Sequence, residues 1–226
     1  MCCLFLAASS TVAIAQTSVV DLVNPIIGTN GMGHTFPGAC VPFGLVQLSP
    51  DTDTIPHNVD GKYQPRSYEY CAGYQHKDSS IVGFSHTHFS GTGHSDLGDI
   101  LIMPTTGTLK LNPGTATNPD GGYRSRFSHG TEISRPGYYE VMLADYGVKA
   151  QLTTTQRENQ RIILDMIHGI YNYDGKVLWT NIRVENDTLV TGYRITNGWA
   201  RTNYTYFAMS FSKPITHYGC EEKDMA

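Results

Sequence analysis

The sequence has few charged residues, and beyond its first 15 residues it has no apolar run long enough to cross a bilayer. Only 16% of its 226 residues are charged, and the formal net charge is -4. The first Lys or Arg in the chain is Lys62. So little positive charge excludes a nucleic-acid platform that binds mainly through phosphate contacts. With 11% aromatic residues the chain is also not mostly disordered, which leaves one sizeable domain or two small ones.

Cysteine is scarce as well. Residues 1–15 carry no charge and end in the small-x-small pattern of a signal-peptidase site, Ala13-Ile14-Ala15. We therefore predict a signal peptide over residues 1–15 that lacks its positively charged n-region, with a buried N-terminal strand or helix as the alternative. Its removal leaves Cys40, Cys71 and Cys220, which are too few for a disulfide scaffold.

Helical periodicity is almost absent, and strand patterns recur instead. Alternation over residues 138–143 and 148–152 predicts a hairpin, and residues 176–184 and 189–196 flank a polar turn at 185–187. Further strands are expected over residues 100–103 (stopped by Pro104), 161–167 and 203–212. From residue 138 onward we predict a meander of antiparallel strands. Residues 24–99 are rich in Gly, His, Ser and Thr and predict long functional loops on one face of the same domain.

The segment 83–99 raises the possibility of a metal site. His86 and His88 are two residues apart, so on an extended strand both imidazoles face one side. Together with His94 and Asp96 they offer a zinc ligand set, which a downstream histidine such as His129 or His168 would complete. The favoured interpretation is a hydrogen-bonded polar surface, with direct substrate contact as a further alternative. We assign no metal ligand from the sequence.

Two other loop segments indicate different chemistry. Residues 28–48 contain spaced glycines, but no Lys follows in the position of a phosphate-binding loop. Residues 68–78 place Tyr68, Tyr70 and Tyr74 around Glu69. Aromatic faces beside a carboxylate suit a sugar, whose C–H faces are weakly apolar and whose hydroxyls need hydrogen-bond partners. Ordinary core or surface tyrosines remain the alternative.

Several motifs in order along the chain closely resemble the start of glycoside hydrolase family 92, which comprises exo-acting α-mannosidases. The matching segments are residues 23–29 (VNPIIGT), 33–39 (GHTFPGA), 41–44 (VPFG), 47–51 (QLSPD), 71–74 (CAGY), 83–88 (GFSHTH), 90–93 (SGTG), 96–100 (DLGDI), 123–129 (YRSRFSH) and 136–139 (PGYY). The resemblance covers nearly all of residues 21–212.

The resemblance implies an all-β fold: an antiparallel β-sandwich of the supersandwich, galactose-mutarotase-like kind, with long Gly/His-rich loops, over residues 16–226. In the family a helical (α/α)₆ barrel follows and supplies the general acid and general base. By resemblance, the intact enzyme is secreted or periplasmic, inverts configuration with the help of calcium, and acts on mannose-containing glycans such as N-glycans or yeast mannan. We expect this chain to lack its catalytic domain, to be inactive alone, and to have no membrane span and no nucleic-acid partner. One alternative is a non-catalytic carbohydrate-binding or relic β-sandwich module. Another is a zinc hydrolase that uses the H-x-H segment at His86 and His88.

By resemblance, seven residues of the sandwich are expected to face the sugar pocket: His34, Tyr68, Glu69, Tyr70, Cys71, His86 and His88. Tyr68 or Tyr70 would stack on mannose, while Glu69 and the histidines would bind its hydroxyls. We also expect the covering domain to leave an apolar patch exposed here, formed by Phe36, Phe43, Tyr74 and Phe89.

The chain departs from the family pattern in three places. The family has Trp where this chain has Tyr68 and Tyr70, and His where it has Gln75. A strand that the family carries after the T-x-R segment seen here at Arg157 is missing. Its loss would open a sheet edge.

Overall fold

The computed structural model describes residues 18–93, 96–150, 160–170 and 176–221. The predicted signal peptide, His94 and the region of the missing strand at Arg157 lie outside these residues. The described chain is built from strands of two to ten residues and short 3₁₀ helices. The strands are β1 (Ser49–Asp51), β2 (Asn58–Val59), β3 (Lys62–Tyr63), β4 (Ser80–Ile81), β5 (Gly83–Ser85), β6 (Leu101–Thr105), β7 (Ser125–Arg126), β8 (Ile133–Arg135), β9 (Tyr138–Leu143), β10 (Val148–Ala150), β11 (Arg161–Asp165), β12 (Val177–Asn186), β13 (Leu189–Thr196) and β14 (Asn203–Ser210). The 3₁₀ helices are η1 (Val19–Leu22), η2 (Pro65–Tyr70), η3 (Pro119–Gly121) and η4 (His129–Thr131).

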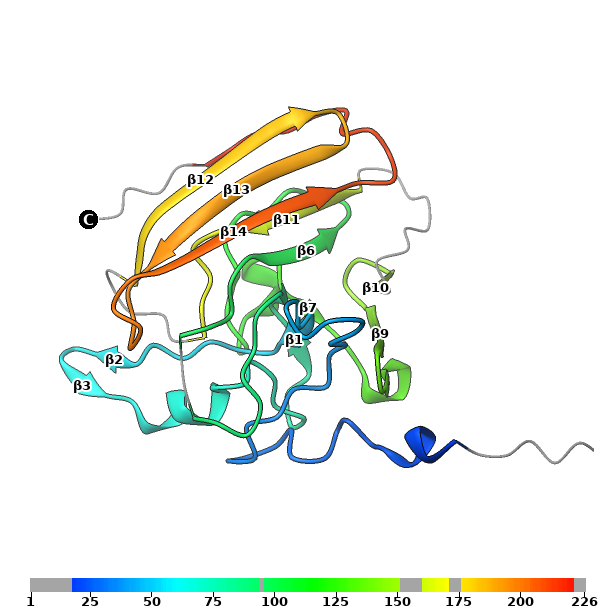
Figure 1. The fold of residues 1–226 in the computed structure, drawn as a ribbon, viewed down its shortest axis with the longest axis vertical. Coiled ribbons are helices and arrows are strands. Elements are labelled where there is room, and N and C mark those ends of the chain that lie inside the picture. Colours follow the sequence, from blue (N-terminus) through cyan, green and yellow to red (C-terminus); the bar gives the residue numbers. More distant parts are fainter. Residues whose placement is uncertain (1–17, 94–95, 151–159, 171–175, 222–226) are drawn as a thin grey trace, which may run out of the picture.

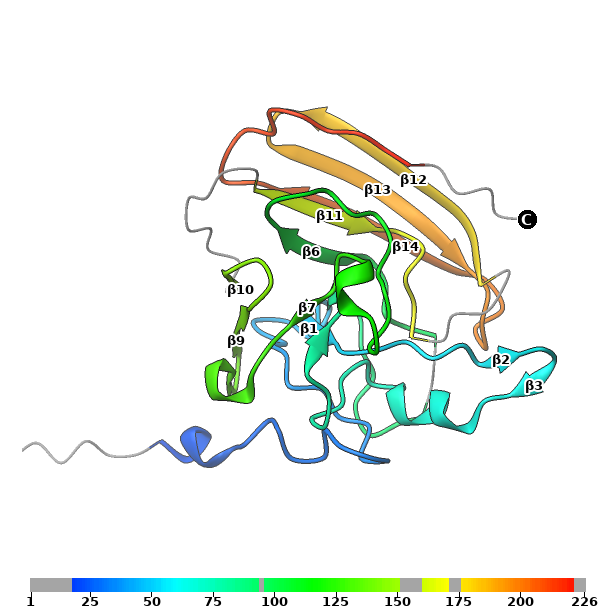
Figure 2. The same cartoon turned by 180° about the vertical axis from the view of Figure 1, so that it is seen from behind.

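Two sheets form the main layers of the domain. One sheet has the strand order β1-β5-β6-β11, and the other has the order β12-β13-β14. Figure 1 and Figure 2 show the β12-β13-β14 sheet lying across β6 and β11, with the loops of the first hundred residues gathered at the opposite end. All pairings are antiparallel. The structure is therefore the all-β antiparallel sandwich that the sequence predicts.

The core lies around the first sheet and the β8-β9-β10 ladder. Leu101 and Met103 of β6 and Val141 and Leu143 of β9 are fully buried. Burial alternates along the strands: Met142 is half-buried between Val141 and Leu143, and Lys149 is exposed between two buried residues. Burial of one such side chain contributes about 1.5–3 kcal/mol, so the period-two pattern selects which strand face points inward. None of the described helices is long and apolar enough to cross a membrane.

The local hairpins agree with the sequence, but the longer-range pairing does not follow the simple meander. β9 pairs with β10, and β12 pairs with β13 across the predicted polar turn. β11 instead leaves the meander and pairs with β6, which lies some 60 residues earlier in the chain. Pro104 does not end β6: it lies opposite Ile162 of β11, while β5 pairs with β6 only at Phe84↔Ile102. A proline is tolerated there because the strand is paired on one side only at that position.

Candidate functional site

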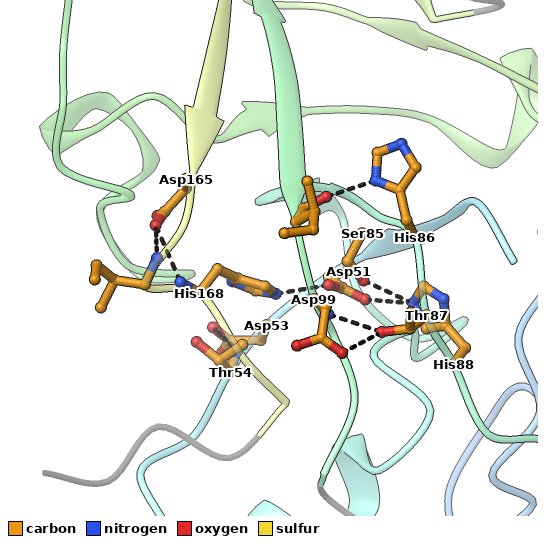
Figure 3. Close-up of polar contacts among 12 residues, drawn as sticks. Asp51, Asp53, Thr54, Ser85, His86, Thr87, His88, Asp99, Asp165 and His168 are labelled. Atoms are coloured by element: carbon orange, nitrogen blue, oxygen red, sulfur yellow. Dashed lines mark hydrogen bonds and ion pairs between the residues drawn. The ribbon is translucent and has the colours of Figure 1, made fainter. Parts of the chain in front are cut away.

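A buried carboxylate joins β1 to the loops that follow β5 and β11. The Asp51 side chain ends β1, is 0% exposed, and contacts one histidine through each oxygen. Its Oδ1 lies 2.9 Å from His88 Nε2, and its Oδ2 lies 2.6 Å from His168 Nε2 (Figure 3). The β1–β5 pairing brings the His88 loop to Asp51, and His168 follows β11.

Polar contacts hold the His88 ring from both sides. Its Nδ1 lies 2.7 Å from the Gln47 carbonyl oxygen, which can only accept, and its Nε2 faces the Asp51 carboxylate. Ser85 Oγ lies 3.0 Å from the same Nε2, so both ring nitrogens of His88 have buried partners. Burial alone would raise the pKa of Asp51, but the electrostatic interaction with His88 and the hydrogen bonds with His168 and His88 outweigh it and hold this pKa well below its ordinary value.

A second buried ion pair links the β12-β13-β14 sheet to the loop that precedes β6. Arg194 of β13 is 0% exposed, and its Nε lies 2.9 Å from Asp99 Oδ1. Asp99 also accepts from Thr87 Oγ1 at 2.8 Å, and Arg194 donates to the backbone carbonyls of Met166 and His168. The segment after β11, which carries His168, therefore contacts both sheets: Asp51 of β1 and Arg194 of β13.

Two of the predicted sugar-facing residues meet at the surface. The His34 ring packs edge-on against the Tyr68 ring, with centroids 4.7 Å apart. Tyr68 remains 39% exposed, and His34 Nε2 is buried with no hydrogen-bond partner among the described residues. A Cβ at Gly93 would lie 2.1 Å from Tyr68 Oη, so only glycine lets the ring lie so close to that loop.

Gln75 holds the loops that carry these residues. Its amide exchanges two hydrogen bonds with the backbone of Gly31, at 2.8 and 3.0 Å, and donates to the Glu69 carbonyl. The Glu69 carboxylate in turn pairs with Lys77. Gln75 therefore links η2 to the 28–34 loop.

The other predicted site residues lie deeper. Tyr70, Cys71 and His88 are buried. Tyr70 donates to Asp78 Oδ1 at 3.2 Å, and burial together with Asp78 raises the pKa of the Tyr70 phenol. His86 is half-buried, with Nδ1 against the Ile100 carbonyl, and burial lowers its pKa. Tyr68 is thus the ring of the pair that is open to a ligand.

The expected apolar patch is present in part. Phe43 and Leu45 are 80% and 85% exposed, and Phe89 is 38% exposed. Phe36 is half-buried, since its ring packs 5.0 Å from the His88 ring. Tyr74 is buried, so its prediction as a surface residue is wrong: the phenol turns inward to donate to Glu132.

The predicted zinc ligands have separate partners where they are described. His86 contacts Ile100, His88 contacts Asp51, and both Asp96 oxygens accept backbone N–H groups, from Trp199 and Ala200, at 3.0 Å. Within the described ranges, the group that gathers three potential ligands is a different one: His76, His129 and Glu132.

Sequence reasoning gave no role to Asp51, Asp99 or Arg194. Asp51 and Asp99 both fall in quoted family motifs, but no local pattern pairs them with histidine or arginine partners up to 117 residues away. The sequence did carry a signal for Arg194. In the alternating strand 189–196 it lies on the same face as Val190 and Thr196, which are buried.

Residues 22–226 match the glycosyl hydrolase family 92 N-terminal domain. The structure is similar to a family GH92 α-mannosidase from Bacteroides thetaiotaomicron, solved with mannoimidazole and without it. The TM-scores are 0.76 and 0.74, with 42% identity over 87% of this chain. An uncharacterized secreted glycosidase from Arthroderma benhamiae is 29% identical over 157 residues, 66% of this chain. The chain spans 26% of the length of the first relative and 17% of the second.

Proposed function

Because the chain belongs to glycosyl hydrolase family 92, as the N-terminal domain of an α-mannosidase-like glycosidase, we propose that it forms one wall of a mannose-binding site in a secreted or periplasmic enzyme. The substrates proposed are mannose-containing glycans such as N-glycans or yeast mannan, cleaved with inversion. The secreted fungal relative supports the location.

The observation that carries this proposal is the Tyr68 ring, which stays partly exposed while His34 buttresses it from the side. A rigid aromatic face offers stacking area to the C–H face of a sugar at little entropic cost. Glu69, beside it on η2, is partly exposed and can accept from sugar hydroxyls. The half-buried His86 adds a ring nitrogen, while the buried His34, Tyr70, Cys71 and His88 are assigned to the support of this wall.

The carboxylates near this wall already have structural partners. An inverting glycosidase needs one carboxyl to protonate the leaving oxygen and another, about 6.5–9.5 Å away, to activate water. The engaged groups are Asp51 (His88 and His168), Asp53 (Arg124), Glu69 (Lys77), Asp96 (backbone N–H groups) and Asp99 (Arg194). This supports a division of labour in which another part of the enzyme brings the acid and base, and the chain alone does not hydrolyse glycans.

An exposed apolar loop supports a covering partner. Val41, Phe43, Leu45 and Val46 are all exposed within six residues. Contiguous apolar surface of this kind is typical of an interface. We infer that the catalytic domain of the intact enzyme packs here, which also predicts that the isolated chain self-associates.

Calcium, expected from the family, is assigned to the intact enzyme rather than to these residues. Calcium takes six to eight oxygen ligands. The three-residue ligand group found among the described residues contains two imidazoles, which do not suit it.

Binding and turnover of the purified chain test the proposal separately. We expect saturation-transfer NMR to detect methyl α-mannoside bound to the wild-type chain. Tyr68→Ala should weaken this binding about tenfold, or about 1.4 kcal/mol, through loss of one aromatic contact. Tyr206→Ala is the control, since Tyr206 is an even more exposed tyrosine on β14 in the other layer. Equal binding by Tyr68→Ala and wild type would refute the assignment of the wall.

The same protein incubated with an α-1,2-mannobioside should release no mannose. Turnover at an enzyme-like rate would show that the acid and base lie within this chain. Binding without turnover would fit the alternative of a carbohydrate-binding module equally well. Addition of the catalytic domain distinguishes the two, because only the enzyme wall should restore hydrolysis.

A further inference from the structure

The two-stranded β4-β7 ladder brings two histidines together. β4 and β7 pair with the register Ser80↔Arg126 and Ile81↔Ser125. Phe127 N also donates to the Ser79 carbonyl at 3.0 Å, which extends the ladder by one step. Continued outward, this antiparallel register brings residue 76 beside residues 129 and 130. His76 and His129 are therefore neighbours although 53 residues separate them.

The backbone at both positions is anchored before any ligand arrives. His76 N donates to the Thr29 carbonyl at 2.8 Å. His129 begins η4, whose N-cap Ser128 accepts from Gly130 N. Glu132 follows directly, with its N–H bonded to the His129 carbonyl at 3.3 Å. A site on such fixed segments loses little entropy when a ligand binds.

The three side chains already converge. One ligand atom from each of His76, His129 and Glu132 lies within 4.8 Å of the others. His129 Nδ1 is 2.7 Å from Glu132 Oε2, and the two imidazole rings lie 4.0 Å apart between centroids. Zinc binds imidazole nitrogen and carboxylate oxygen at about 2.0–2.2 Å, so small side-chain rotations would close the group around one ion.

A second layer of hydrogen bonds holds the carboxylate in place. Tyr74 Oη donates to Glu132 Oε1 at 2.9 Å, and Tyr139 Oη donates to the same oxygen at 2.6 Å. The Glu132 side chain is only 3% exposed, whereas His129 is exposed and His76 is half-buried. Ligating carboxylates in metal sites are typically oriented by such outer hydrogen bonds. The arrangement has a fixed inner ligand and an entrance through the two histidines.

We propose that His76, His129 and Glu132 bind a divalent transition-metal ion, with Zn²⁺ as the best match. Two imidazoles and one carboxylate are a known zinc ligand set that leaves the fourth position to water. Bound there, the ion cross-links the segment before β4 to the turn after β7 and so stabilises the open end of this ladder. Metal binding here does not depend on the proposed function.

The experiment uses the purified full chain, stripped of metal and titrated with ZnCl₂ by calorimetry and with Co²⁺ by visible absorption. We expect one Zn²⁺ per chain, and a four-coordinate Co²⁺ spectrum without a thiolate charge-transfer band. His76→Ala and His129→Ala should each weaken binding by about tenfold or more. Glu132→Gln, which keeps acceptors for Tyr74 and Tyr139, should do the same. Zn²⁺ should raise the melting temperature of wild type but not of His76→Ala.

His217→Ala is the matched control, because His217 is exposed and lies near the free Cys220 in the C-terminal segment. It should leave affinity unchanged. A thiolate band, loss of binding in His217→Ala, or unchanged affinity in folded His76→Ala and His129→Ala would each overturn the proposal. So would the absence of binding to the wild-type chain.

Discussion

The buried pair between the layers allows a prediction with a worked magnitude. Arg194→Met keeps the length and apolar bulk of the side chain but removes its charge. Asp99 then remains buried with no cation 2.9 Å away, and the carbonyls of Met166 and His168 lose a charged donor. Breaking one partner of a buried pair costs about 3–5 kcal/mol. Against a total stability of about 5–15 kcal/mol, this is a large fraction.

Urea unfolding of the purified chain, followed by circular dichroism, measures this loss. For a chain of this size, a loss of 3–5 kcal/mol also lowers the melting temperature by about 6–20 °C, at about 2–4 °C per kcal/mol. Asp99→Asn in the Arg194→Met background should recover part of the loss, because it removes the uncompensated charge.

Arg183→Met supplies the control on the neighbouring strand. The Arg183 side chain is 74% exposed and pairs with Glu185 at 3.2 Å. Exposed pairs contribute about 0–1 kcal/mol, so this variant should unfold almost as wild type does. If Arg194→Met and Arg183→Met were equally stable, the reasoning that the 194–99 pair joins the layers would be refuted.

Two further predictions concern pH. The pKa of Asp51 lies below its ordinary value of 3.8, so the contribution of Asp51 to stability is complete above about pH 4 and is lost on acidification. The difference in unfolding free energy between wild type and Asp51→Asn, measured by urea unfolding, should therefore narrow below pH 4. A constant difference would contradict the buried pairing. Burial and the nearby charge of Arg194 lower the pKa of Lys176 from 10.5 to about 8, so the unfolded chain binds more protons between these values. The stability of wild type relative to Lys176→Met should therefore rise from pH 8 to 10, and identical pH profiles would show that Lys176 titrates normally.

The local elements could be read from the sequence because their cause is local. Alternation along residues 138–143 and 189–196 fixes which side chains face inward, and polar turns fix where each strand reverses. The pairing of β11 with β6 could not be read in this way, because it depends on which strand edge, some 60 residues earlier in the chain, is available for pairing in the folded sheet. The family motifs indicated the sandwich and the sugar wall, but they did not distinguish exposed Tyr68 from buried Tyr70 two residues later.

The sequence by itself determined the strand pattern, the family and the group of loops that forms the candidate wall. Only the tertiary structure decided that His88 pairs with buried Asp51, that Arg194 joins the layers through Asp99, and that the His76 and His129 rings lie in contact. The physical reason is that charge pairing and ligand geometry depend on distances across the fold, whereas periodicity and turn chemistry act between neighbours in the chain.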